Sequence, residues 1–344
     1  MRAAALMTGP DTLLDHLAPI CAQLRAPCIL TDPAHFQIAA TFYPQVTWNL
    51  MDPLDVDLAY LANSYDALIG CGKFWAIEMG PLFELFFQKR MRFVFCPHGH
   101  SDKESMAKGK VKQDIVLAYG KSMQRDHVEY NHMIIIGNYR HMFYRMHKKF
   151  YDDLAYKYIF SRLERGKKTV FYAPTWFGQD RLEEFIMGCH RLIQELSPCY
   201  NVVIKLHPFL EDRFSGSMQA FKGHYRKNKC VFFIERFPAI YPLISGCDCY
   251  IGDASSIGYD ALAMDMPLFF LDEDKCKTRL HACGFCLPKE GSWSEFIDKH
   301  LIYGEKKKEK EALMEDVFPL HIKGEKDNTT LELADLLLAA LQVE

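Results

Sequence analysis

Four segments of the sequence carry residue types that can hold phosphate or move a proton, each directly after a short apolar run. A histidine is the side chain best suited to accept a proton near neutral pH, and hydroxyl and ammonium groups donate to phosphate oxygens. We therefore interpret these positions as candidates for phosphate binding and proton transfer. They are His98, Thr175, the pair Lys205 and His207, and the loop from Asp253 to Ser256.

The loop from Asp253 to Ser256 follows an apolar strand and opens a predicted helix at Ile257–Ala263. The first turn of a helix has N–H groups without partners and a partial positive charge, so it favours a bound anion. Ser255 and Ser256 add hydroxyl donors there. Asp253 either orients a hydroxyl, backbone amides or a ribose, or is an ordinary helix-capping aspartate.

His98 stands just before a glycine at the end of the predicted strand Arg92–Cys96. This position favours a ring that projects toward a ligand and accepts a proton. The alternative is a histidine bonded to a neighbouring loop carbonyl. Lys103 either neutralises a phosphate or lies in solvent.

Lys205 and His207 follow the predicted strand Asn201–Lys205 and lie two residues apart, which places them on one side of an extended chain. An ammonium and an imidazole together favour a bound anion such as a diphosphate leaving group. The alternative is a pair that only caps the sheet. Thr175 follows the predicted strand Thr169–Tyr172 and is a candidate phosphate donor, whereas Trp176 is interpreted as a packing residue.

Short apolar runs alternate with amphipathic segments of helical length through most of the 344 residues. This alternation predicts an α/β fold with parallel sheets and crossover helices.

A chain of this length favours two domains. A highly charged segment places the boundary, so we expect a first Rossmann-like domain at 1–145, a linker helix at 146–168 and a second Rossmann-like domain at 169–344. Ligands of such sheets bind beyond the carboxyl ends of the strands, here in a cleft between the domains. The charged stretch Gly304–Lys310 predicts a solvated turn, and Thr330–Leu341 a closing helix.

The composition excludes several classes of protein. A net charge of −3 gives no overall basic field, which disfavours a nucleic-acid partner. The twelve cysteines are scattered without the spacing of a disulfide framework, so we expect reduced thiols in a cytoplasmic protein. Neither a signal sequence nor an apolar run of membrane-spanning length is expected. The residue pattern shows no metal-binding set.

The second half of the sequence contains three motifs: Tyr172-Ala173-Pro174-Thr175-Trp176, Lys205-Leu206-His207-Pro208 and Asp253-Ala254-Ser255-Ser256-Ile257-Gly258-Tyr259-Asp260. Together with His98-Gly99 and Lys103, they resemble the CDP-glycerol glycerophosphotransferases, the teichoic-acid primases and polymerases of the GT-B fold. The resemblance covers roughly residues 90 to 275.

The resemblance implies transfer of glycerol phosphate, or a similar polyol phosphate, from a CDP-activated donor to an acceptor hydroxyl, with release of CMP. His98 is then the base on the acceptor, His207 lies near the donor phosphates, and Ser255 and Ser256 hold the diphosphate. Arg140 stands at the family's arginine and is assigned to the donor phosphates. No cofactor or metal is implied, and the partners are a nucleotide-activated donor and a lipid-linked acceptor. The location implied is the cytoplasm, with peripheral contact at the inner face of the membrane.

The chain departs from the family pattern at three places: it has Trp176-Phe177 for Trp-Arg, Gly137-Asn138-Tyr139-Arg140-His141-Met142 for Gly-x-Pro-Arg-x-Asp, and His100-Ser101 for Thr-Pro. Two alternatives therefore stay open. One is another GT-B enzyme acting on a nucleotide sugar, either a glycosyltransferase or a UDP-sugar 2-epimerase. The other is a non-catalytic protein that keeps the fold.

Overall fold

The structure is a computed structural model. It describes residues 2–72, 75–100, 114–126, 132–175, 182–271, 278–303, 306–319, 335 and 339. Contacts divide the chain into two compact units: unit 1 is 1–143 with 314–344, and unit 2 is 144–313. The first segment of unit 1 ends at residue 143, two residues before the expected end of the first domain at 145. The segment expected as a linker falls within unit 2, and the assignment of 314–344 to unit 1 was not predicted.

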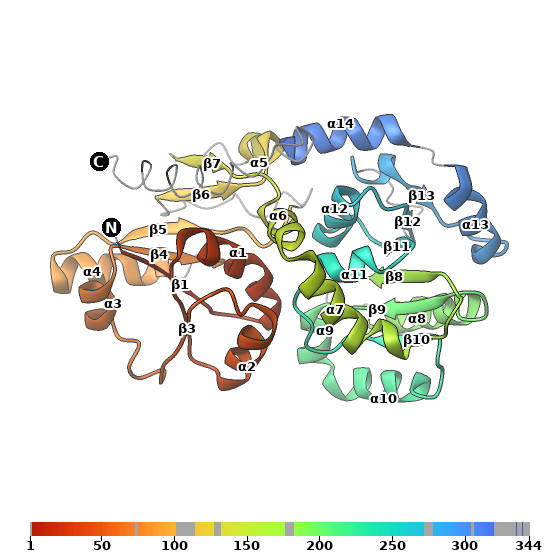
Figure 1. Cartoon of the computed structure of the whole chain (residues 1–344), viewed down its shortest axis with the longest axis horizontal. Coiled ribbons are helices and arrows are strands. Elements are labelled where there is room, and N and C mark those ends of the chain that lie inside the picture. The colour runs from red at the N-terminus through yellow and green to blue at the C-terminus, as the bar shows by residue number, and fades with distance from the viewer. Residues whose placement is uncertain are drawn as a thin grey trace. The chain divides into compact units, whose positions relative to one another are not determined.

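Unit 1 contains a seven-stranded parallel sheet, within the described residues, in the order β3-β2-β1-β4-β5-β6-β7 (Figure 1). Its strands are β1 (Ala3–Leu6), β2 (Cys28–Leu30), β3 (Trp48–Leu50), β4 (Ala67–Gly70), β5 (Arg92–Phe95), β6 (Ile115–Ala118) and β7 (Met133–Ile135). Its helices are η1 (Asp11–Leu13), α1 (Leu14–Leu24), α2 (Pro33–Phe42), α3 (Leu58–Ser64), η2 (Trp75–Met79), α4 (Gly80–Phe87) and α5 (Lys121–Asp126). Helix α6 (Tyr139–Met146) begins in unit 1 and ends in unit 2.

Unit 2 contains a six-stranded parallel sheet, counted over its described residues, in the order β10-β9-β8-β11-β12-β13. Its strands are β8 (Thr169–Ala173), β9 (Asn201–Ile204), β10 (Val231–Phe233), β11 (Cys249–Gly252), β12 (Leu268–Phe270) and β13 (Phe285–Cys286). Its helices are α7 (Lys148–Tyr158), η4 (Phe160–Arg162), α8 (Leu182–Leu196), α9 (Pro208–Arg213), α10 (Ser215–Tyr225), α11 (Tyr241–Ser245), α12 (Ser256–Ala263), η7 (His281–Cys283) and α13 (Trp293–Tyr303). Helix α14 (Lys307–Val317) runs from unit 2 into unit 1.

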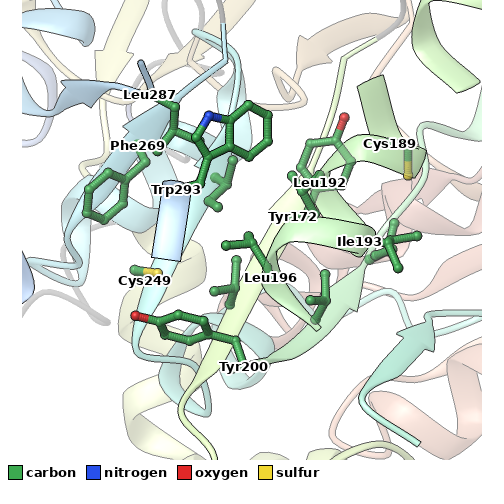
Figure 2. Packing of buried hydrophobic residues seen from close by; sticks show 14 of the residues in the cluster. Tyr172, Cys189, Leu192, Ile193, Leu196, Tyr200, Cys249, Phe269, Leu287 and Trp293 are labelled. Carbon is green, nitrogen blue, oxygen red and sulfur yellow. The ribbon is translucent and has the colours of Figure 1, made fainter. Parts of the chain in front are cut away.

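The core of unit 2 shows why these segments form a sheet covered by helices. The residues of β8, β9 and β11 are buried throughout, as expected for parallel strands covered on both faces. Helix α8 contributes Cys189, Leu192, Ile193 and Leu196, a helical spacing that places them on one face. Figure 2 shows these side chains gathered with Tyr172, Tyr200, Cys249, Phe269, Leu287 and Trp293. The strand ends described below are therefore held by a packed interior.

The two sheets confirm the predicted fold class, and the predicted strands are correct to within one or two residues. Two expectations need correction. Lys307–Lys310 is not a turn but the start of α14, where Lys307 pairs with Glu311 one helical turn later at 3.8 Å. Cys286 is disulfide-bonded rather than reduced, because the fold rather than the sequence spacing decides which sulfurs meet. Ten other cysteines are free thiols. The expected closing helix Thr330–Leu341 lies almost wholly outside the described residues, as do Lys103 and Trp176.

Candidate functional site

In unit 2, the candidate residues follow three neighbouring strands of one parallel sheet. β8 pairs with β9 on one side and with β11 on the other. The carboxyl ends of parallel strands meet at the same edge, so the chain after each strand reaches the same region. This edge carries Thr175 after β8, Lys205 and His207 after β9, and Asp253, Ser255 and Ser256 after β11. We call these six residues the strand-end cluster.

Asp253 connects the segments that follow β8 and β11. Its Oδ2 accepts from the backbone N–H of Thr175 at 2.9 Å and from the Thr175 hydroxyl at 3.2 Å. Asp253 is buried, and 9% of the residue is exposed to solvent. Of the roles considered for Asp253, orienting a hydroxyl and a backbone amide is the one that these contacts describe.

Ser255 is the N-cap of α12, and its hydroxyl is held within the protein. The Oγ accepts from the Gly258 N–H at 3.4 Å and lies 3.2 Å from the hydroxyl of the buried Tyr250. Burial raises the pKa of Tyr250, which keeps that hydroxyl protonated. Gly252 leaves room for the Tyr250 hydroxyl, because a Cβ at residue 252 would lie 2.3 Å from that oxygen.

Ser256 is the first residue of α12 and is half-buried. Ser255 caps the Gly258 N–H, so the N–H groups of Ser256 and Ile257 are the ones that helix geometry leaves without an intrahelical acceptor. These groups and the helix dipole favour an anion at this end. Of the two serines, Ser256 is the better placed to contact one.

His207 is fixed in orientation by its own loop. It is the N-cap of α9, and its Nδ1 accepts from the Phe209 N–H at 3.2 Å. The neutral ring therefore carries its proton on Nε2, which can donate to a phosphate oxygen. The half-exposed Phe209 ring lies 5.3 Å from the imidazole. Lys205 donates from Nζ to the Phe237 carbonyl at 3.0 Å, which holds its charge against the segment that follows β10.

In unit 1, His98 follows β5 and is an exposed residue. Its ring meets the buried His16 of α1 edge to face, with centroids 6.5 Å apart. Although the residue as a whole is exposed, its neighbours remove part of the water around the ring; this desolvation and then the charge of Arg140 lower the pKa of His98, so its neutral form is favoured. Solvent screens part of this effect at an exposed residue.

Arg140 on α6 is buried and makes a salt bridge to Asp15 of α1, with Nη1 3.0 Å from Oδ2. The Tyr43 hydroxyl donates to the other carboxylate oxygen at 2.9 Å. The guanidinium also lies 6.0 Å from the centroid of the Tyr119 ring. The sequence interpretation missed Asp15 and His16, although two polar residues in the apolar run from Leu14 to Cys21 were an available signal.

Within the described residues, no group of three or more His, Cys, Asp or Glu side chains is placed to hold a metal ion.

The comparisons with known proteins bear on the family and the fold of this chain. The sequence model of the family described as CDP-glycerol:poly(glycerophosphate) glycerophosphotransferase matches residues 126–289. The family resemblance is confirmed. The match includes Arg140 and the whole strand-end cluster, whereas His98 and Lys103 lie outside it. A search of curated proteins finds no match.

Solved structures with the same fold include the wall teichoic acid polymerase TagF. One TagF structure is 15% identical with a TM-score of 0.67, covering 99% of this chain and 89% of that chain. A second, a histidine variant soaked with CDPG, is 14% identical with a TM-score of 0.65 and covers 99% and 88%. The UDP-GlcNAc 2-epimerase from Methanocaldococcus jannaschii is 12% identical with a TM-score of 0.60 and covers 98% and 100%. At these identities the likeness shows the fold, and the family match supports a glycerophosphotransferase-type transferase.

Proposed function

We propose that the protein transfers glycerol phosphate, or a similar polyol phosphate, from a CDP-activated donor to an acceptor hydroxyl and releases CMP. The observation that carries this proposal is the strand-end cluster: one sheet edge with a fixed imidazole and a helix N-terminus, inside the region that matches the family model. These groups suit a diphosphate, whose oxygens need hydrogen-bond donors and positive charge.

Unit 2 is proposed to bind the donor. The Nε2–H of His207 and the first N–H groups of α12 with the Ser256 hydroxyl are assigned to the diphosphate oxygens. Thr175 and Asp253 hold the loops that carry these donors, and Lys205 adds a positive charge to the edge. Lys103 is retained as a proposed phosphate contact from the sequence, although it lies outside the described residues.

Unit 1 is proposed to activate the acceptor through His98. The neutral imidazole accepts the hydroxyl proton as the acceptor oxygen forms a bond to the phosphorus of the glycerol phosphate. The anhydride P–O bond breaks, and its electron pair leaves with CMP. We assign no metal ion or cofactor to this step.

The test is a comparison of donors with the purified chain. Isothermal titration should show binding of CDP-glycerol and of CDP, and CMP should be released when an acceptor is supplied. His98→Gln should keep donor binding and lose CMP release. Binding of UDP-GlcNAc in place of the CDP compounds would instead favour the 2-epimerase alternative, which the epimerase-like fold supports. Absence of binding and turnover with any donor would favour a non-catalytic protein.

A lipid-linked acceptor and a cytoplasmic location with membrane contact are also proposed from the resemblance. Among the helices that the structure describes, none has the length and apolar character needed to span a membrane. Lys89, which follows α4, is engaged within unit 1, where it donates to the Ala62 and Tyr65 carbonyls, both at 2.6 Å. The exposed Leu85 and Phe86 of α4, 70% and 63% exposed, are the better candidates. Replacing both by serine should reduce flotation with anionic vesicles, whereas the exposed Met187→Ser should not.

A further inference from the structure

The Arg140–Asp15 salt bridge has a geometry that differs from a phosphate-binding arginine. The Arg140 residue is 4% exposed, and its Nη1 is directed at a buried carboxylate contributed by another helix. A phosphate-binding arginine presents its guanidinium to the ligand. Here the guanidinium is used inside unit 1, between α1 and α6.

Aromatic residues next to Arg140 also contact the segment that carries His98. The Tyr119 hydroxyl lies 3.4 Å from His16 Nδ1 and 3.4 Å from the Pro97 carbonyl, the residue before His98. The Tyr139 ring stacks on Tyr119 at 5.4 Å, and its hydroxyl lies 3.2 Å from Cys96 Sγ. The Pro97 carbonyl, directly before His98, thus accepts a hydrogen bond from Tyr119, whose ring lies next to Arg140.

The titratable groups near His98 include Cys96 after β5 and Tyr119 after β6, together with groups from two helices. α1 contributes His16, edge-on to the His98 ring, and Asp15, which neutralises Arg140. α6 contributes Arg140, whose charge is felt by both histidines. Because Asp15 and Arg140 form one buried pair, changing either member alters the charge that His98 experiences.

We propose that the Arg140–Asp15 salt bridge is a positioning element for His98, acting through His16 and Tyr119, and that Arg140 is not a ligand of the donor phosphates. The proposal rests on the proposed function for its role in catalysis. The Arg140 charge favours the neutral, proton-accepting form of the His98 ring, Asp15 balances that charge, and the pair holds the loop after β5. This assignment replaces the role that the family resemblance implied for Arg140.

The experiment follows the titration of His98 by NMR in the whole chain, with no substrate. Its ring signal is assigned by its loss in His98→Gln. Asp15→Asn leaves the Arg140 charge unbalanced and should lower the midpoint of His98. The double variant Asp15→Asn with Arg140→Met removes both charges together, which avoids an isolated buried ion. In that variant the midpoint should rise but stay below the ordinary histidine value of about 6.5, because desolvation, the larger cause of the lowered pKa, remains.

The control is Arg145→Met, the same substitution at an exposed position of α6, which should leave the His98 midpoint unchanged. CDP-glycerol affinity, measured by calorimetry, should stay within about twofold in the double variant, and the acid limb of the kcat–pH profile should move with the NMR midpoint. An unchanged His98 midpoint in both variants would overturn the proposal. The proposal would also be overturned if the double variant lost tenfold or more of its CDP-glycerol affinity while the Arg145→Met control did not. The titration needs no donor, so its result stands even where the proposed transferase activity fails.

Discussion

Asp253 accepts two hydrogen bonds from Thr175 at one carboxylate oxygen, from the backbone N–H at 2.9 Å and from the hydroxyl at 3.2 Å. The two residues follow adjacent strands, since Gly252 of β11 pairs with Ala173 of β8. The pair therefore joins two loops at the carboxyl edge of the unit 2 sheet. A carboxylate in this position shapes the edge even where it does not touch a ligand.

Asp253→Ala should destabilise the protein, because it removes an ionised acceptor from two donors. Hydrogen bonds to charged groups contribute about 1.5–3 kcal/mol, so we expect a loss of about 2 kcal/mol in the free energy of unfolding. Thr175→Val removes only the hydroxyl donor and keeps the backbone bond, so it should cost less. Urea unfolding of both variants measures this order. Equal stability of Asp253→Ala and the wild type would show that the connection contributes nothing.

Ser255 and Ser256 are adjacent but should respond differently to alanine. Ser255 caps α12 and contacts Tyr250, so Ser255→Ala should lower the free energy of unfolding by about 1 kcal/mol. Ser256 is half-buried at the first helical position, so Ser256→Ala should change stability little and weaken CDP-glycerol binding. Chemical unfolding and calorimetry on the two variants separate these effects. The reverse pattern would assign the ligand contact to Ser255.

His207 can be tested by separating its two nitrogens. Asparagine is a good N-cap and can accept from the Phe209 N–H in place of Nδ1, but it offers no group at the position of Nε2. His207→Asn should keep the fold and lose CMP release by about 100-fold or more, as expected when one oriented donor is removed. His207→Ala should lose activity and also about 1 kcal/mol of stability. Near wild-type turnover by His207→Asn would remove His207 from the phosphate site.

The sequence predicted the sheets well because their strands are apolar runs that end in Gly, Pro or Asp. It missed β3, since Trp48 and Asn49 are only half-buried in a three-residue strand at the sheet edge. It predicted a helix start at Ile257 and a ligand-binding hydroxyl at Ser255, but not that this hydroxyl caps α12 and lies 3.2 Å from the hydroxyl of Tyr250. Contacts of this kind depend on tertiary packing, which short-range spacing does not encode.

The site in unit 1 was harder to predict for the same reason. Arg140 and Asp15 are 125 residues apart in the sequence, and only the fold brings α1 and α6 together. The family resemblance supplied the position of Arg140 but not its partner. Whether His98 and His207 act on the same reactants stays a prediction, which the donor and variant experiments address.

His16 should make stability depend on pH. Burial, then Arg140 and then His98 lower its pKa well below the ordinary histidine value. The unfolded chain protonates this ring near pH 6.5, whereas the folded protein resists protonation, so stability is lost as pH falls below about 6.5. A single such group changes the free energy of unfolding by up to about 1.4 kcal/mol per pH unit.

His16→Asn isolates this contribution. The amide can replace the Nδ1 contact with the Tyr119 hydroxyl but does not titrate, so the loss of stability between about pH 7.5 and pH 5.5 should become smaller. His224→Asn, at an exposed histidine of α10, serves as the control and should leave the slope unchanged. His98 and His147 also have lowered pKa values, so part of the slope should remain in His16→Asn. The same slope in His16→Asn and the wild type would mean that His16 is protonated as readily in the folded protein as in the unfolded chain.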